Sequence, residues 1–401
     1  MKPWIAVAGA LILCFATSAS AQQPTSEEPD PRTQYPPFLA NSYFSLNVGS
    51  IRYIFSADQL APGFEAESLD IPHTAARVDL FGHRFFEHLS AQVTYMRPIE
   101  YVNYKNINGD GEIHRIATTY GGLTLTFDFR LTDRISAYGE GGLGVTSRSG
   151  FQIDGKTVVK EARYAAGLLG AGLVYHVRPE IDVVLGATYS PGRKSFDQPS
   201  TRLYAMGMRY YLRRLPEAVV EENRHSKFTF PVNVVRLGYS SNVVTYGVNT
   251  ALTRAAVFFG GDVETRRGFT LDYQRNVYHS SMFAVDFGAS ASYWKSQGEK
   301  DIFRTASVYP LLRFFVVHTE SADYYASYSI AGPTYISAVI IDGRDTGDHF
   351  TFQDFIGVGA FMGKARRLNA ELGLKHFSNG NIFPNNPGIK IPLTLTLGLT
   401  F

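Results

Sequence analysis

The chain has 401 residues and a net charge of +2, so neither a strongly basic nucleic-acid-binding protein nor an acidic, solvated chain is expected. Tyr (24), Phe (29) and Gly (37) are abundant. No segment beyond the N-terminus approaches the roughly 18 consecutive apolar residues that a transmembrane helix needs. Helical membrane spans are therefore excluded from the mature chain.

The first 21 residues are expected to form a cleaved signal peptide. Lys2 precedes an apolar stretch from Trp4 to Ala16, and Ala19-Ser20-Ala21 provides a cleavage site before Gln22. The single cysteine, Cys14, lies inside this segment. The exported chain is therefore expected to form no disulfide.

The mature sequence repeats the pattern of transmembrane β-strands. Such strands need only about 9 to 11 residues, in which apolar side chains facing lipid alternate with polar ones facing the lumen. Within 119–130, one face carries Leu123, Leu125, Phe127 and Phe129, and the other carries Thr124, Thr126 and Asp128. Short links at 130–134 and 176–180 alternate with long polar connections at roughly 56–73, 98–115, 149–160 and 190–201. The pattern predicts an all-β, antiparallel transmembrane barrel, although a soluble β protein would share the alternation.

The amphipathic segments divide into two sets. About eight lie in 41–214 and about eight more in 232–401, while 215–231 is polar, contains two prolines and breaks the alternation. We predict an N-terminal tail (22–40), two tandem eight-stranded barrels and a periplasmic linker between them. A single sixteen-stranded porin is the alternative. Residues 255–263 fit either a ninth strand or part of a long loop.

The final residues, Ile391–Phe401, carry apolar side chains at every odd position and end in an aromatic residue. This ending resembles the signal that the barrel assembly machinery of the bacterial outer membrane recognises during biogenesis. The outer membrane is therefore the expected location, with that machinery as a partner.

Four charged residues of the first half are expected to point into the barrel by parity: Asp128, Glu140, Asp182 and Arg209. Charges in such an interior must pair to be tolerated. A packed polar interior is therefore expected rather than an open pore.

One short sequence could carry chemistry, namely His376-Phe-Ser378-Asn379-Gly380 at the extracellular end of the penultimate predicted strand. Residues i and i+2 share a face of a strand, so the His376 imidazole can act as the base that activates the Ser378 hydroxyl. Both residues share the parity of Leu372, which predicts that they face lipid. A lipid acyl ester is the natural substrate of such a nucleophile. The alternative is an ordinary polar strand end that leads into a loop.

The string HFSNGNIFPNNPG (376–388) resembles the His-x-Ser-Asn motif and downstream turn of the lipid A 3-O-deacylase (PagL) family. The resemblance covers roughly 232–401, and it implies an eight-stranded outer-membrane barrel with a serine hydrolase site on its outer wall. The first half resembles a small outer-membrane barrel only in general pattern.

The resemblance implies roles for individual residues. Ser378 would be the nucleophile and His376 the general base, while Asn379 and the backbone near Gly380 would stabilise the oxyanion. The family has a Glu fourteen residues after the His, and this sequence has Lys390 there. A lysine cannot stabilise an imidazolium.

Strand register suggests a replacement acid. If a tight turn pairs Met362 with Leu368, antiparallel pairing places Asp354 opposite His376 on the same face. Asp354 is therefore a candidate third member of the catalytic set. The alternative is an ordinary polar residue at the headgroup boundary.

Other signals are weaker. Residues 106–113 partly resemble a calcium loop, but position twelve is Ala117 and a hairpin turn is favoured. No metal site or cofactor is expected. Basic residues of the predicted outer loops, which could meet lipopolysaccharide phosphates, are Lys105, Lys160, Arg193 and Lys194.

The sequence thus predicts an outer-membrane serine esterase that removes an ester-linked acyl chain from lipid A. The rival is a non-enzymatic barrel, structural, adhesive or porin-like, and Lys390 is the feature that favours it.

Overall fold

The computed structural model describes residues 30–242, 261–382 and 385–401. The expected signal peptide and residues 22–29 of the expected tail lie outside the described residues, and so does most of the possible strand at 255–263. In the described ranges, no helix is both long and apolar enough to cross a membrane.

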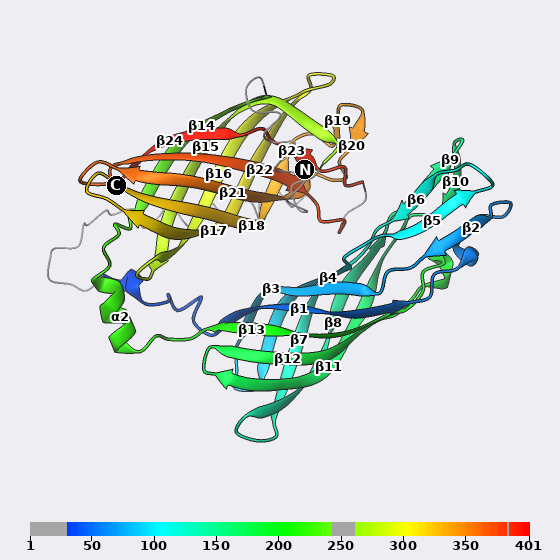
Figure 1. Ribbon diagram of the computed structural model, residues 1–401, viewed down its shortest axis with the longest axis horizontal. Helices are drawn as coiled ribbons and strands as arrows, with labels where there is room; N and C mark the ends of the chain where they lie inside the picture. The colour runs from blue at the N-terminus through cyan, green and yellow to red at the C-terminus, as the bar shows by residue number, and fades with distance from the viewer. Residues whose placement is uncertain (1–29, 243–260, 383–384) are drawn as a thin grey trace, which may run out of the picture.

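Within 30–242, eight strands close into an antiparallel barrel in the order β1-β13-β12-β11-β8-β7-β4-β3 (Figure 1). The pairing of β1 with both β13 and β3 closes the ring. The strands are β1 (Ser42–Tyr53), β3 (Thr74–Arg84), β4 (Leu89–Pro98), β7 (Thr118–Arg130), β8 (Ile135–Arg148), β11 (Ala162–Arg178), β12 (Ile181–Ser190) and β13 (Thr201–Leu212). Each segment that the alternation predicted in this half is a strand.

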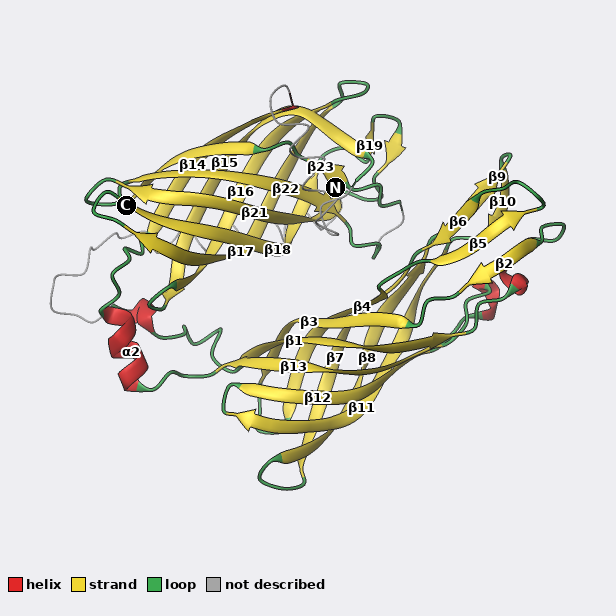
Figure 2. Ribbon diagram, viewed as in Figure 1, coloured by secondary structure: helices red, strands yellow, loops and turns green. Residues whose placement is uncertain are grey.

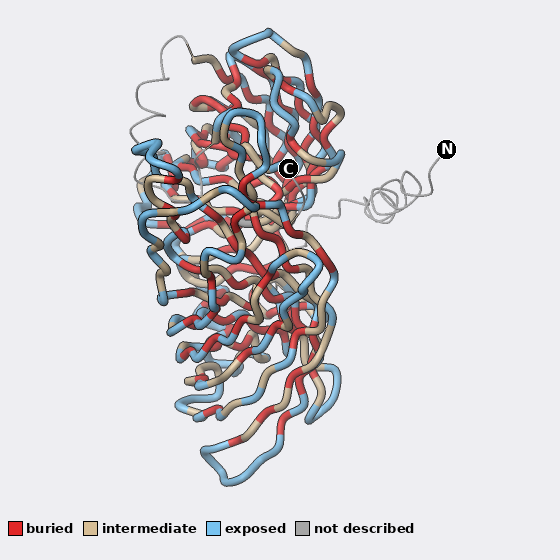
Figure 3. The backbone as a smooth tube through the Cα atoms, turned by 90° about the vertical axis from the view of Figure 1, so that its right-hand side faces the viewer, coloured by how far each residue is buried: buried red, intermediate tan, exposed pale blue. Residues whose placement is uncertain are grey.

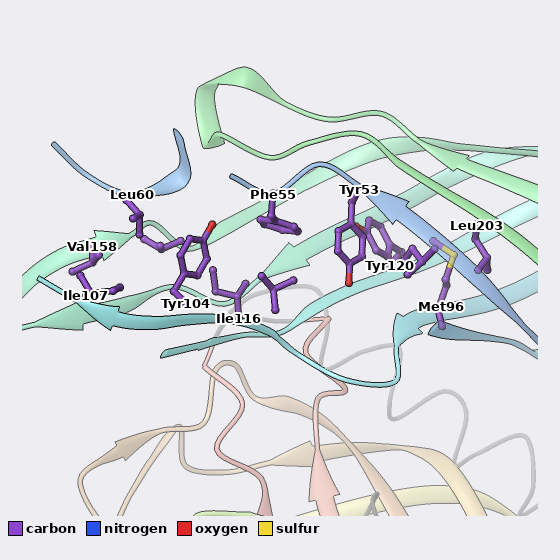
Figure 4. Packing of buried hydrophobic residues seen from close by; sticks show 14 of the residues in the cluster. Tyr53, Phe55, Leu60, Met96, Tyr104, Ile107, Ile116, Tyr120, Val158 and Leu203 are labelled. Atoms are coloured by element: carbon purple, nitrogen blue, oxygen red, sulfur yellow. The ribbon is translucent and has the colours of Figure 1, made fainter. Parts of the chain in front are cut away.

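Beyond one end of this barrel, the long connections form small sheets of their own (Figure 2). Three of them carry the strands β2 (Ala66–Asp70), β5 (Val102–Ile107), β6 (Ile113–Ile116), β9 (Phe151–Ile153) and β10 (Lys156–Val159). The expectation of plain polar loops was therefore wrong for these connections. They pack because they share a hydrophobic cluster, which includes Phe55, Leu60, Tyr104, Ile107 and Val158 (Figure 4).

The described part of 231–401 forms a second antiparallel ring in the order β14-β24-β22-β21-β18-β17-β16-β15. Pairing of β14 with β15 closes it. The strands are β14 (Asn233–Ser241), β15 (Val263–His279), β16 (Phe283–Ser296), β17 (Ile302–His318), β18 (Ala322–Ile336), β21 (Phe350–Met362), β22 (Leu368–Ser378) and β24 (Thr394–Thr400). At one end, β19 (Ile340–Ile341) pairs with β20 (Arg344–Asp345), and β23 (Ile389–Lys390) bridges β15 and β22. Two separate rings confirm the two-barrel prediction and exclude the single large porin.

Buried and exposed residues alternate along the strands (Figure 3). On β7, for example, Leu123 is 62% exposed and the neighbouring Thr124 is 1% exposed. Three of the four expected inward charges pair: Glu140 with Arg77 at 2.7 Å, Asp182 with His176 at 2.9 Å and Asp128 with Arg84 at 3.3 Å. The fourth, Arg209, instead donates a 3.3 Å hydrogen bond to the Tyr211 hydroxyl and lies over the Tyr43 ring. An apolar exterior around a packed polar interior is the arrangement of an outer-membrane barrel.

The two barrels are joined at the end where their strand connections are short. Helix α2 (Glu217–Arg224) lies in the region expected to be a linker. The side-chain oxygen of Asn223 on this helix accepts a 3.1 Å hydrogen bond from the Ser281 N–H, at the β15–β16 turn. Arg32, ahead of the first barrel, donates a 3.0 Å hydrogen bond to Asn276 on β15. The segments on both sides of the first barrel are therefore attached to the second.

Candidate active site

Strands β21 and β22 bring Asp354 and His376 together on the outer side of the second barrel. Met362 pairs with Leu368, and the register then places Asp354 directly opposite His376, as the sequence predicted. Oδ2 of Asp354 lies 3.6 Å from Nδ1 of His376, which is an ion-pair distance and slightly longer than a hydrogen bond. Both residues share the outward parity of Leu372, whose side chain is exposed.

A β-bulge in β18 fixes the other oxygen of Asp354. The register of β18 against β21 shifts between Ser329 and Gly332, and Ala331 within the bulge has a φ of +52°. The Ala331 N–H donates a 2.8 Å hydrogen bond to Oδ1 of Asp354. A left-handed conformation costs a residue with a side chain about 1–2 kcal/mol, so it persists only where the surrounding structure imposes it. The backbone therefore holds one carboxylate oxygen while the other faces the imidazole.

Lys390, at the position of the family Glu, is the neighbour of His376 on its other side. β23 pairs with β22 so that Lys390 lies beside His376, and it pairs with β15 so that Glu264 lies beside Lys390. Lys390 Nζ donates a 2.8 Å hydrogen bond to Oε1 of Glu264. Glu264, Lys390, His376 and Asp354 thus form one row across four strands. Since Glu264 neutralises the ammonium, the carboxylate available to the imidazole is that of Asp354.

Ser378 ends β22 two residues after His376, on the same face of the strand. No hydrogen bond joins Ser378 and His376 within the part of the chain that the structure describes. His376 is 3% exposed and Ser378 is half-buried. The expected outward parity of this pair is correct, but His376 is covered and does not meet lipid directly. The chain beyond β22 returns as β23 and places Lys390 beside the imidazole, which leaves little of the ring accessible.

The turn after Ser378 is stabilised by its own asparagines. The Asn379 N–H donates a 2.9 Å hydrogen bond to Oδ1 of Asn386, and the Asn386 side chain donates one of 3.1 Å to Oδ1 of Asn381. Gly380 has a φ of +63°, a conformation that residues with side chains rarely adopt. The N–H of Gly380 has no acceptor among the described residues. Of the two expected oxyanion donors, Gly380 is therefore the one whose backbone N–H is available.

The segment that partly resembles a calcium loop forms the turn between β5 and β6, as predicted. Asn106 and Asn108 in this turn have φ values of +51°, which asparagine tolerates well. Across the described ranges, no group of three or more His, Cys, Asp or Glu residues is placed to hold a metal ion.

Comparison with known proteins shows a similarity over the second barrel. Residues 263–399 match the family model of lipid A 3-O-deacylase (PagL). The second barrel is a PagL-like barrel. Together with the apolar exteriors of both rings, this match assigns the protein to the bacterial outer membrane. No curated protein sequence matches the chain.

Several solved outer-membrane barrels are similar to part of the chain. The outer membrane enzyme PagL is 14% identical with a TM-score of 0.31, and the match covers 42% of this chain and 99% of that one. Ail of Yersinia pestis is 16% identical with a TM-score of 0.28, over 42% of this chain and 96% of that one. OprG from Pseudomonas aeruginosa is 12% identical with a TM-score of 0.27, over 43% of this chain and 97% of that one.

The PagL-like barrel includes two site residues that sequence reasoning missed. Glu264 reaches Lys390 although the two are 126 residues apart, through a parallel pairing that strand alternation does not reveal. Ala331 acts through its backbone, and nothing in its local sequence marks the bulge. Glu264 could have been identified only if β23 had been predicted, because the pairing of β23 with β15 places Glu264 beside Lys390.

Proposed function

We propose that the PagL-like barrel is an outer-membrane serine esterase that removes an ester-linked acyl chain from lipid A. The observation that carries the proposal is the Asp354 carboxylate 3.6 Å from Nδ1 of His376, two residues before a serine on the same strand face. The family description supplies the substrate class.

In this proposal, Ser378 Oγ attacks the ester carbonyl carbon while Nε2 of His376 takes the hydroxyl proton. Nδ1 faces Asp354, whose charge stabilises the imidazolium. The Gly380 N–H stabilises the oxyanion. The bond between the acyl carbon and the sugar oxygen then breaks while the imidazolium protonates that oxygen, which releases the sugar hydroxyl and leaves an acyl-serine. A water activated by the same imidazole hydrolyses the acyl-serine to the free fatty acid and Ser378. Catalytic hydrogen bonds often tighten only when substrate binds, which accommodates the present His376–Ser378 geometry.

Glu264 has a supporting role. An ammonium beside an imidazole opposes formation of the imidazolium, because like charges repel. The 2.8 Å contact between Lys390 and Glu264 offsets that repulsion. Asp354 is then sufficient to replace the carboxylate that the family has at the position of Lys390.

The test is mass spectrometry of lipid A from cells that express the full chain. We expect wild type to remove one hydroxyacyl group, Ser378→Ala to remove none, and Asp354→Asn to act roughly 10³- to 10⁴-fold more slowly, as for other triads that lose their acid. Ser281→Ala is the matched control, because His279 and Ser281 form the same spacing at the β15–β16 turn and lie away from the site.

Two outcomes would contradict the proposal or part of it. Identical lipid A from wild type and Ser378→Ala, with both proteins folded in the membrane, would support a non-enzymatic barrel in which Lys390 marks a degenerate site. Full activity of Asp354→Asn would remove Asp354 from the mechanism and leave a Ser-His pair.

A further inference from the structure

The segment Gly380–Ile382, just beyond Ser378, lies against the outer wall of the first barrel. Its three consecutive carbonyl oxygens each accept a hydrogen bond from a side chain of that wall. Tyr95 donates to Gly380 O at 3.1 Å, Thr119 donates to Asn381 O at 3.0 Å, and Arg163 donates to Ile382 O. We call Tyr95, Thr119 and Arg163 the clamp.

The clamp is a continuous patch formed by several strands. Thr119 on β7 and Arg163 on β11 both pair with Ser147 of β8, which lies between them, and Tyr95 on β4 pairs with Gly121 of β7. Thr119 is only 2% exposed, so the outer wall of the first barrel is covered at this point.

The loop also fits the shape of the wall. A Cβ at Gly121 would lie 3.4 Å from Cδ1 of Ile382, so the glycine leaves the space that the isoleucine side chain approaches. The contact therefore combines three hydrogen bonds with close packing, on a surface that would otherwise face lipid.

We infer that the first barrel is a positioning domain. Through the clamp, it holds the turn after Ser378 that contains Gly380, the proposed oxyanion donor of the PagL-like barrel. This inference rests on the proposed function. Gly380 supplies the oxyanion donor in that mechanism, and its N–H shares a rigid peptide plane with the Asn379 carbonyl. That carbonyl accepts a 3.1 Å hydrogen bond from the N–H of Ile382, which belongs to the clamped segment. Sites on loops are less exact than sites on strands, and a displacement of about 1 Å can cost about 10²-fold in rate. The hydrogen-bond donors of the clamp restrict such displacement of the loop.

The test compares the full-length wild type with Tyr95→Phe/Thr119→Val, which removes two donors and largely keeps their shape. We expect kcat for lipid A deacylation to fall about ten- to a hundredfold with KM unchanged. Hydrogen exchange at the amides of 380–382 should become faster. Tyr95→Phe/Thr119→Ser keeps one hydroxyl and should recover part of the rate. Tyr204→Phe is the control, since Tyr204 lies on the outer wall at β13 and is 49% exposed.

The inference is overturned if the double variant keeps the wild-type kcat, or if its exchange at 380–382 is unchanged. Failure of the proposed function has a different signature, because wild type and Ser378→Ala would then already give identical lipid A. That result would also remove the catalytic role of the clamp, and the exchange rates would still show whether the wall holds the loop.

Discussion

Lys390 lies between two groups, the Glu264 carboxylate on one side and the His376 imidazole on the other. Its 2.8 Å contact with Glu264 keeps the ammonium paired. Asp354 approaches the imidazole from the opposite strand. In the proposed mechanism, the acid therefore lies on the side of His376 opposite to Lys390.

A charge exchange tests this arrangement. In an Asp354→Asn background, the pair Glu264→Lys and Lys390→Glu preserves an ion pair in reverse order and places a carboxylate beside His376. We expect at least a tenfold recovery of the lost rate, because either flanking carboxylate can stabilise the imidazolium; a tenfold change corresponds to about 1.4 kcal/mol. Release of hydroxyacyl chains by purified protein measures it.

The control is Asp354→Asn with Glu264→Gln, which removes a carboxylate without moving one toward His376 and should recover nothing. If the charge-exchanged protein is no faster than Asp354→Asn alone, a carboxylate at position 390 does not stabilise the His376 imidazolium.

At the scale of residues, the sequence predicted the strand register at the candidate site better than the packing around that site. The motif and the turn between Met362 and Leu368 were enough to place Asp354 opposite His376. The burial of His376 was not predictable, because it depends on β23, a strand of two residues. Period-2 alternation cannot reveal so short an element.

Strands of the second barrel are tied together across its lumen by buried charges. Arg236 on β14 lies 2.5 Å from Glu371 on β22, and their side chains are 1% and 0% exposed. Ser327 on β18 donates a 3.0 Å hydrogen bond to the other oxygen of Glu371. Three strands that are not adjacent in the ring, β14, β18 and β22, are therefore connected through one carboxylate.

Removing one member of this pair should destabilise the barrel. Arg236→Met leaves Glu371 buried without its cation, and we expect the free energy of unfolding to fall by about 3–5 kcal/mol. Urea titration of the protein in lipid vesicles measures this loss. Arg236→Met/Glu371→Leu should lose much less, since an apolar pair of similar volume often replaces a buried ion pair at little cost. Equal losses in the single and double variants would contradict this view of the pair.

At the scale of elements, the long strands were predictable and the short ones were not. Alternation marked every barrel strand because one face meets lipid and the other the packed interior. The strands of the small sheets beyond the first barrel have few residues each and pack on a shared cluster, so their formation depends on contacts between separate loops. Helix α2 was missed because 215–231 was interpreted from its prolines and polarity alone.

The whole molecule has two attachments between its barrels. Helix α2 and the segment before β1 connect them at the end with short turns, and the clamp connects them near the candidate site. No sequence pattern predicts a contact between two outer walls. Each wall taken alone has the composition of a surface that meets lipid.

Cutting the chain within 215–231 should leave both barrels able to fold but lower the activity of the second. Each ring closes its own strand edges, so both halves should insert and fold when expressed apart, which heat-dependent electrophoretic mobility would show. The isolated second barrel should deacylate lipid A about ten- to a hundredfold more slowly than the intact chain, because it lacks the clamp. Equal rates for the intact chain and the isolated half would argue that the first barrel serves another purpose.

The covalent connection through α2 has a consequence for how the protein works in a crowded membrane. A loop and a wall on one chain meet at an effective concentration set by the linker, whatever the number of copies nearby. The turnover of each intact molecule should therefore be independent of its surface density. Two separate barrels would have to find each other by lateral diffusion, and their activity would rise with expression level. Because of the linker, the activity per molecule should not depend on how many copies of the protein the membrane contains.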